Sequence, residues 1–213
     1  MRHLLAFFAL PASGVLPLAM AEVAIGTNLT IILDFENSPS LAAMNTMRSE
    51  VSHLLRRTGV KLDFAVRKEL PPYQDFEDLV LVRLRGTCRM AGLAPLMDER
   101  GPLGWSHTVE GSILPFGEVS CDQVRRVVEA AVYGRGGPHA RELLFGRALG
   151  RVLAHELYHI IGATHRHGRR GITQAALSAQ ELVAERLEIA PEDVAHLVGR
   201  LRERAALPSR TTQ

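Results

Sequence analysis

Apolar and polar residues follow one another in blocks along the chain, and the spacing of the apolar positions predicts a succession of strands and helices. Apolar runs with strand periodicity, bounded by glycine, proline or asparagine, fall at residues 29–35, 60–66, 78–84 and 112–119. Apolar spacings of three and four predict helices at residues 40–57, 122–133, 138–161, from Ser178 onward and 191–207. Because most strands precede most helices, this order predicts an α+β fold with a small helical tail.

Single residues mark the limits of several predicted elements. Ser40 and Ser178 are typical N-caps, and Glu181 stands three residues after Ser178, as a capping box requires. Pro138 suits the first turn of a helix. Pro115 lies inside the predicted strand 112–119, and proline has no N–H to donate to a ladder. We therefore expect that strand to be an edge strand or a bulged one.

The composition is that of an ordinary globular domain. The chain has 213 residues, of which 46% are hydrophobic and 23% charged, so it can bury a core. The formal net charge is only +2, and the arginines are spread along the chain rather than gathered on one helix or face. We therefore expect no nucleic-acid partner. The composition leaves the oligomeric state open.

The first 21 residues have the pattern of a secretory signal peptide. Arg2 and His3 give a positive start, an apolar run follows, and residues 19–21 (Ala-Met-Ala) are typical of a signal-peptidase site. The apolar run is short for a bilayer span and is interrupted by prolines. We therefore expect a mature domain at residues 22–213 that is secreted or periplasmic and keeps no membrane anchor after cleavage.

The two cysteines, Cys88 and Cys121, each follow a strand-like run. In an oxidising compartment a disulfide between them is plausible. Two free, buried thiols are equally compatible with the sequence.

The long helix predicted from Pro138 onward contains the sequence HELYH at residues 155–159. His155 and His159 lie one turn apart and about 40° apart around the helix axis, so both imidazoles can bind one Zn²⁺. Glu156 stands beside them, where its carboxylate can reach a metal-bound water without binding the metal. This arrangement predicts a metal site with a general base.

The residues after the motif provide candidates for a third ligand. Gly162 can take a positive φ, end the helix and turn the chain, which would bring His165 back over the first two histidines. Three protein ligands and one water are typical of catalytic zinc, whereas a structural site has four protein ligands. His167 is an alternative third ligand. Glu181 and Glu185 are further alternatives, because zinc also accepts carboxylates.

Through HELYHIIGATH, at residues 155–165, the chain resembles the zincin metallopeptidases and, among them, the metzincins. The resemblance implies an N-terminal lobe at 22–162, with a mixed β-sheet and the active-site helix, and a small helical C-terminal lobe at 163–213. It also implies a zinc-dependent endopeptidase in which an edge strand above the cleft pairs with an extended substrate. Residues 112–119 are the candidate for that strand.

The chain departs from the metzincin pattern after the third histidine of the motif. Metzincins have a methionine turn beneath the zinc, but the last methionine here is Met97, and no tyrosine follows Tyr158. The resemblance is therefore to a divergent branch, and residues 171–178 have to form the floor of the site by other means.

Together these features predict a secreted zinc endopeptidase that acts on peptide or protein substrates. His155, His159 and His165 would bind the zinc, and Glu156 would be the general base. Two hypotheses from other classes stay open: a zincin-fold binding module without proteolytic activity, and a zinc hydrolase of non-peptide amides.

Overall fold

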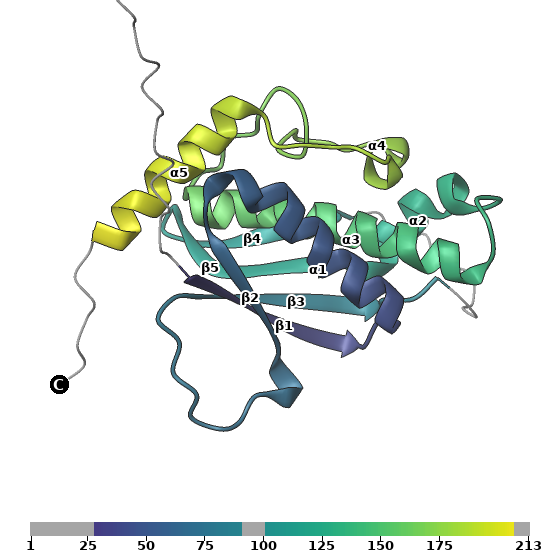
Figure 1. Cartoon of the computed structure of the whole chain (residues 1–213), viewed down its shortest axis with the longest axis horizontal. Helices are drawn as coiled ribbons and strands as arrows, with labels where there is room; N and C mark the ends of the chain where they lie inside the picture. Colours follow the sequence, from purple (N-terminus) through teal and green to yellow (C-terminus); the bar gives the residue numbers. More distant parts are fainter. Residues whose placement is uncertain (1–27, 91–100, 207–213) are drawn as a thin grey trace, which may run out of the picture.

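The computed structural model describes residues 28–90 and 101–206, and this part of the chain forms one mixed sheet with helices against one face (Figure 1). The strand order is β2-β1-β3-β5-β4. The strands are β1 (Asn28–Asn37), β2 (Lys61–Val66), β3 (Leu79–Thr87), β4 (Gly104–Val109) and β5 (Ser112–Ser120). Neighbouring strands are parallel except β4, which is antiparallel to β5. The predicted α+β class is confirmed, whereas the predicted signal peptide, residues 1–21, lies outside the described residues.

All five predicted helices form, and two of them begin at the predicted N-caps. They are α1 (Leu41–Leu55), α2 (Cys121–Val132), α3 (Pro138–Gly162), α4 (Ala179–Val183) and α5 (Pro191–Ala206), with short 3₁₀ turns η1 (Arg56–Thr58) and η2 (Arg67–Glu69). The Ser40 side chain caps α1, and Ser178 with Glu181 forms a complete capping box on α4. No helix in the described ranges is both long enough and apolar enough to span a membrane.

Helix α3 runs through the middle of the molecule, between the sheet, α1 and the C-terminal helices (Figure 1). Two glycines one turn apart allow α1 to approach it closely. A Cβ atom at Gly146 would lie 2.4 Å from the carbonyl oxygen of Ala43, and one at Gly150 would lie 2.8 Å from that of Met47. Since neither glycine has a side chain, the two backbones can touch, and α3 is held firmly along its length.

Strand β5 is an internal strand between β3 and β4, so of the two alternatives for residues 112–119 the edge strand is wrong, and the irregular pairing with β4 agrees with the bulged one. Pro115 is tolerated because the ladders leave a gap around it. Pairing with β3 begins only at Phe116, and pairing with β4 shifts register between Ser106 and Thr108. Within the described residues the edge strands of the sheet are β2 and β4, and β4 falls partly in a segment whose sequence is rich in turn residues.

Cys88 and Cys121 form a disulfide, which decides between the two readings of the cysteines. Both residues are fully buried. The bond joins the chain just after β3 to the first residue of α2, and α2 in turn lies against α3. The disulfide thus ties the sheet to the helical layer.

Candidate metal centre

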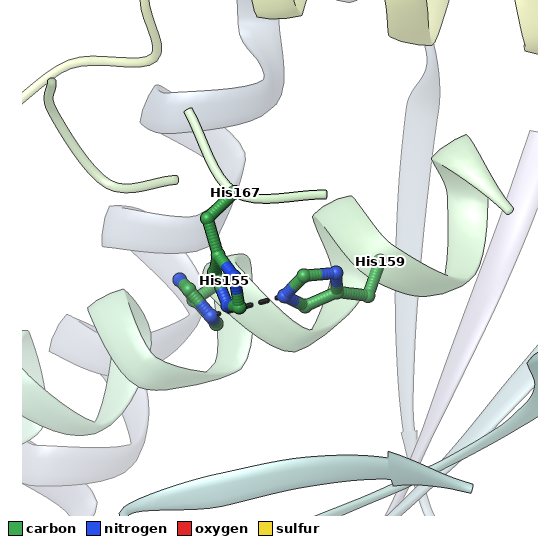
Figure 2. A group of neighbouring side chains, drawn as sticks. All are labelled: His155, His159 and His167. Carbon is green, nitrogen blue, oxygen red and sulfur yellow. Dashed lines mark hydrogen bonds between the residues drawn. The ribbon is translucent and has the colours of Figure 1, made fainter. Parts of the chain in front are cut away.

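His155 and His159 point toward one another from adjacent turns of α3 (Figure 2). The Nδ1 atom of His155 lies 2.8 Å from the carbonyl oxygen of Ile172, and the Nδ1 atom of His159 lies 2.7 Å from that of Thr164. A carbonyl oxygen can only accept a hydrogen bond, so each Nδ1 carries the proton. The two Nε2 atoms, which lie 3.1 Å apart, are therefore left with their lone pairs facing the same point.

This arrangement fits a metal ion. Burial lowers the pKa of His155 to about 4 and also lowers the pKa of His159, so both imidazoles are neutral at pH 7. Neither Nε2 can donate a hydrogen bond to the other, and two facing lone pairs repel unless a cation lies between them. Backbone carbonyls that hold the opposite ring nitrogen are a typical support for zinc-binding histidines. The pair therefore has the tautomers and the orientation that a divalent metal requires.

His167 completes a group of three imidazoles. It comes from the loop that follows α3, and its ring is directed toward the other two (Figure 2). One nitrogen from each of His155, His159 and His167 lies within 4.8 Å of the others. The His167 ring stacks on His155 with a centroid distance of 5.3 Å and meets His159 edge to face at 4.8 Å.

His165, the third ligand expected from the motif spacing, is not part of this group. It is exposed, and its Nε2 atom lies 3.2 Å from the carbonyl oxygen of Gly111, in the turn between β4 and β5. The structure thus gathers His155 and His159 with His167, which the sequence offered only as an alternative. The group contains no carboxylate, and Glu181 is engaged in capping α4.

The end of α3 differs from the expectation that Gly162 takes a positive φ. Gly162 is the last helical residue, and Ala163 adopts the left-handed conformation, with φ 43°. Gly162 instead allows a close approach: a Cβ atom there would lie 3.2 Å from the ring of His196, whose Nε2 is 3.0 Å from the Gly162 carbonyl oxygen. The turn therefore starts one residue later than expected, which changes where the following histidines lie.

Glu156 is buried beneath the edge of the sheet, with 4% of its surface exposed. Its Oε2 atom accepts a hydrogen bond of 2.8 Å from the hydroxyl of Ser106 on β4. Burial raises the pKa of Glu156 to about 7, and the hydrogen bond from Ser106 partly opposes this shift. Gly104 leaves room for the carboxylate, because a Cβ atom there would lie 2.9 Å from Oε1. A carboxyl group that titrates near neutrality can both accept and return a proton.

A pocket of about 540 Å³ opens beside the three imidazoles and Glu156. Its other walls come from the approach to β4, from β5, α2, α3 and the segment before α4. The apolar side chains among them are Leu103, Trp105, Ile113, Val127, Val152 and Leu177. The pocket thus places metal-binding and proton-accepting groups next to an apolar surface.

The segment expected to form the floor of the site does lie there. Ile172 is fully buried and its carbonyl holds His155, while Gln174 and Leu177 line the pocket. Sequence reasoning missed Ser106 and Gly104. Nothing local distinguishes them, because their link to Glu156 spans about fifty residues of chain and depends on how β4 pairs with β5.

Comparison with known proteins agrees with this fold. No protein-family model matches the chain, and no curated protein matches its sequence. Among solved structures, a zinc-dependent peptidase from Methanocorpusculum labreanum is similar, with a TM-score of 0.50 and 14% identity, over 78% of this chain and 99% of that one. An archaemetzincin from Methanopyrus kandleri also aligns, with a TM-score of 0.49 and 14% identity, over 86% of this chain and 99% of that one. The chain is therefore similar in fold to a zinc-dependent peptidase.

Proposed function

We propose that the protein is a zinc-dependent peptidase whose metal is bound by His155, His159 and His167. One observation carries the proposal: the unprotonated Nε2 atoms of His155 and His159 converge at 3.1 Å, with a third imidazole beside them. Two further features support hydrolysis rather than metal storage, namely the buried Glu156 and the adjoining pocket. The similar fold of the Methanocorpusculum labreanum zinc-dependent peptidase supports the same class.

In the proposed reaction the metal would activate water, and one carboxylate would transfer the proton. When bound, zinc acts as a Lewis acid and lowers the pKa of water at the site. Glu156 accepts the proton of the attacking water, and it later returns that proton to the leaving amine. The Ser106 hydroxyl holds Oε2 of Glu156, which keeps the carboxylate in one orientation while its other oxygen takes part in proton transfer.

The surroundings of the site suit an extended peptide. Among the described residues β4 is the edge strand beside the pocket, and its outer backbone N–H and C=O groups can pair with a substrate strand. The apolar wall that includes Val127, Val152 and Leu177 then favours an apolar side chain next to the scissile bond. In this proposal β4, and not residues 112–119, is the strand that pairs with the extended substrate.

Two other functions compete with this proposal. A zinc hydrolase of non-peptide amides would use the same metal and base. A binding module without activity would need neither a buried Glu156 nor a hydroxyl that holds it, so the hydrogen bond from Ser106 favours an enzyme.

We also propose that the protein is secreted or periplasmic. The signal-peptide pattern of residues 1–21 supports this, and so does the Cys88–Cys121 disulfide, because disulfides persist mainly in oxidising compartments. Expression of the full chain in a bacterium followed by N-terminal sequencing tests it. A mature N-terminus near Glu22 in the periplasm or medium is expected, whereas an uncleaved cytoplasmic chain would contradict export.

The first experiment on function is elemental analysis of the purified chain, followed by cleavage assays. We expect about one zinc per chain, cleavage of a denatured protein such as casein, and little cleavage of cell-wall amides. Glu156→Gln is the matched control, since it keeps the shape of the side chain and all three imidazoles. It should retain zinc and lose turnover. Zinc binding with activity only on non-peptide amides would favour the second candidate, and zinc binding with no hydrolysis of either substrate would favour the binding module.

A further inference from the structure

The loop that carries His167 and the turn that holds His155 meet at one residue, Thr173. The carbonyl oxygen of Ile172, just before it, accepts the Nδ1–H of His155. The carbonyl oxygen of Thr173 itself accepts a hydrogen bond of 2.8 Å from the backbone N–H of Gly168, which directly follows His167. Two of the three candidate ligands are thus placed by adjacent carbonyls of one short turn.

The Thr173 side chain anchors this turn to the rest of the molecule. Thr173 is fully buried, and its hydroxyl donates a hydrogen bond of 2.6 Å to Oδ2 of Asp193. Asp193 lies in the first turn of α5, where the helix dipole favours a carboxylate. The hydroxyl of Tyr158, next to His159 on α3, lies 3.4 Å from the other carboxylate oxygen, Oδ1. One carboxylate therefore links the turn, α5 and the ligand-bearing helix.

The loop at Gly168 packs closely against the side chains of Thr173 and Asp193. A Cβ atom on Gly168 would lie 2.2 Å from the Thr173 hydroxyl and 2.4 Å from Oδ2 of Asp193, so only glycine allows the loop to seat there. On the other side, the N–H of Ile172 donates to the carbonyl of Glu188, and Gly171 forms a β-bridge with Ile189. The turn is therefore held on one side by the buried side chains of Thr173 and Asp193 and on the other by backbone contacts.

We infer that Thr173 and Asp193 are positioning residues for the metal site, and that their hydrogen bond fixes the turn that orients His155 and His167. The inference rests on the proposed metal site and goes further, because it assigns the support of His155 and His167 to one named pair. Loss of the Thr173 hydroxyl would free the turn, and both imidazoles would lose the orientation that lets them share one ion.

Zinc affinity tests this directly, measured on the purified full chain by competition with a chromophoric chelator. Thr173→Val keeps the shape of the side chain and removes the hydroxyl, and we expect zinc binding to weaken about tenfold or more. Thr173→Ser restores the hydroxyl and should bind zinc within about threefold of the wild-type protein, on the same scale. Glu192→Gln is the matched control, because Glu192 adjoins Asp193 and its carboxylate forms an exposed ion pair with Arg170; the zinc affinity of this variant should not change.

The zinc affinities of these variants either support the inference or overturn it. Equal zinc affinity in Thr173→Val and the wild-type protein would overturn it and leave the proposed function intact. If Thr173→Val does not fold, Asp193→Ala decides in its place, since it removes the oxygen that accepts the hydrogen bond of the Thr173 hydroxyl: weaker zinc binding by a folded chain supports the inference and unchanged binding overturns it. A wild-type chain that binds no zinc would overturn both proposals.

Discussion

The hydroxyl of Ser106 donates a hydrogen bond of 2.8 Å to Oε2 of Glu156, and this contact joins the edge strand of the sheet to the helix that carries HELYH. Among the described residues, Ser106 is the side chain whose hydrogen bond orients this buried carboxylate. Gly104 on β4 and Gly117 on β5 also lie against the Glu156 side chain, so the two strands pack closely on it. The catalytic group of the proposed enzyme is thus set by packing between a strand and a helix.

Ser106→Ala should lower kcat by about 10- to 100-fold, the range expected for one hydrogen bond to a charged group. KM and zinc content should change little, because Ser106 contacts Glu156 and none of the imidazoles. Steady-state kinetics on a peptide substrate measures this. Ser106→Thr keeps the hydroxyl and should recover much of kcat, and Ser112→Ala, on the same hairpin, is the control. A Ser106→Ala variant as active as the wild-type protein would show that the contact has no role in turnover.

His167→Ala and His165→Ala distinguish the two candidates for the third ligand. We expect His167→Ala to lose most of its zinc affinity and His165→Ala to stay near the wild-type value, because only His167 joins the two α3 imidazoles. Chelator competition with both variants measures this. The reverse result would mean that binding zinc rearranges the loop toward the spacing of the metzincin motif.

The stability of the zinc-free protein should depend on pH through Glu156. Its pKa is about 7 in the folded protein, against 4.5 as the ordinary value. Between these values the unfolded chain loses the proton that the folded chain keeps, so the free energy of unfolding falls as pH rises from 4.5 to 7 and is then level. Glu156→Gln removes this loss of stability, which reaches about 3 kcal/mol once the pH is above the folded-state pKa.

Urea unfolding of the zinc-free wild-type and Glu156→Gln proteins at several pH values checks this. The difference between them should grow from pH 4.5 to 7 in favour of the variant. Titration of His155, whose pKa is lowered to about 4, destabilises both proteins equally as pH falls from 6.5. A difference that does not change with pH would contradict the raised pKa of Glu156.

Reduction of the Cys88–Cys121 disulfide should destabilise the protein by about 3–4 kcal/mol, the loop-closure effect for cysteines 33 residues apart. Urea unfolding with and without reductant measures the change. A Cys88→Ala/Cys121→Ala variant should unfold like the reduced protein and be insensitive to reductant. An oxidised protein no more stable than the reduced one would contradict a stabilising role for the bond.

The sequence by itself determined the features that depend on neighbouring residues. The caps at Ser40 and Ser178, the helical and strand periodicities and the shared helix face of His155 and His159 all follow from geometry within one or two turns. For this reason the α+β class, the pair of facing histidines with Glu156 beside them, and the element order apart from strand β4 could be predicted.

Only the tertiary structure decided the features that join distant parts of the chain. Which strands lie at the edges of the sheet, whether the two cysteines pair and which side chain holds Glu156 all depend on contacts between residues far apart in sequence. Whether His167 or His165 joins the other two imidazoles also depends on such contacts. Both lie in one short loop, and the loop takes its course because Gly168 seats against Thr173 and Asp193, which local periodicity does not encode.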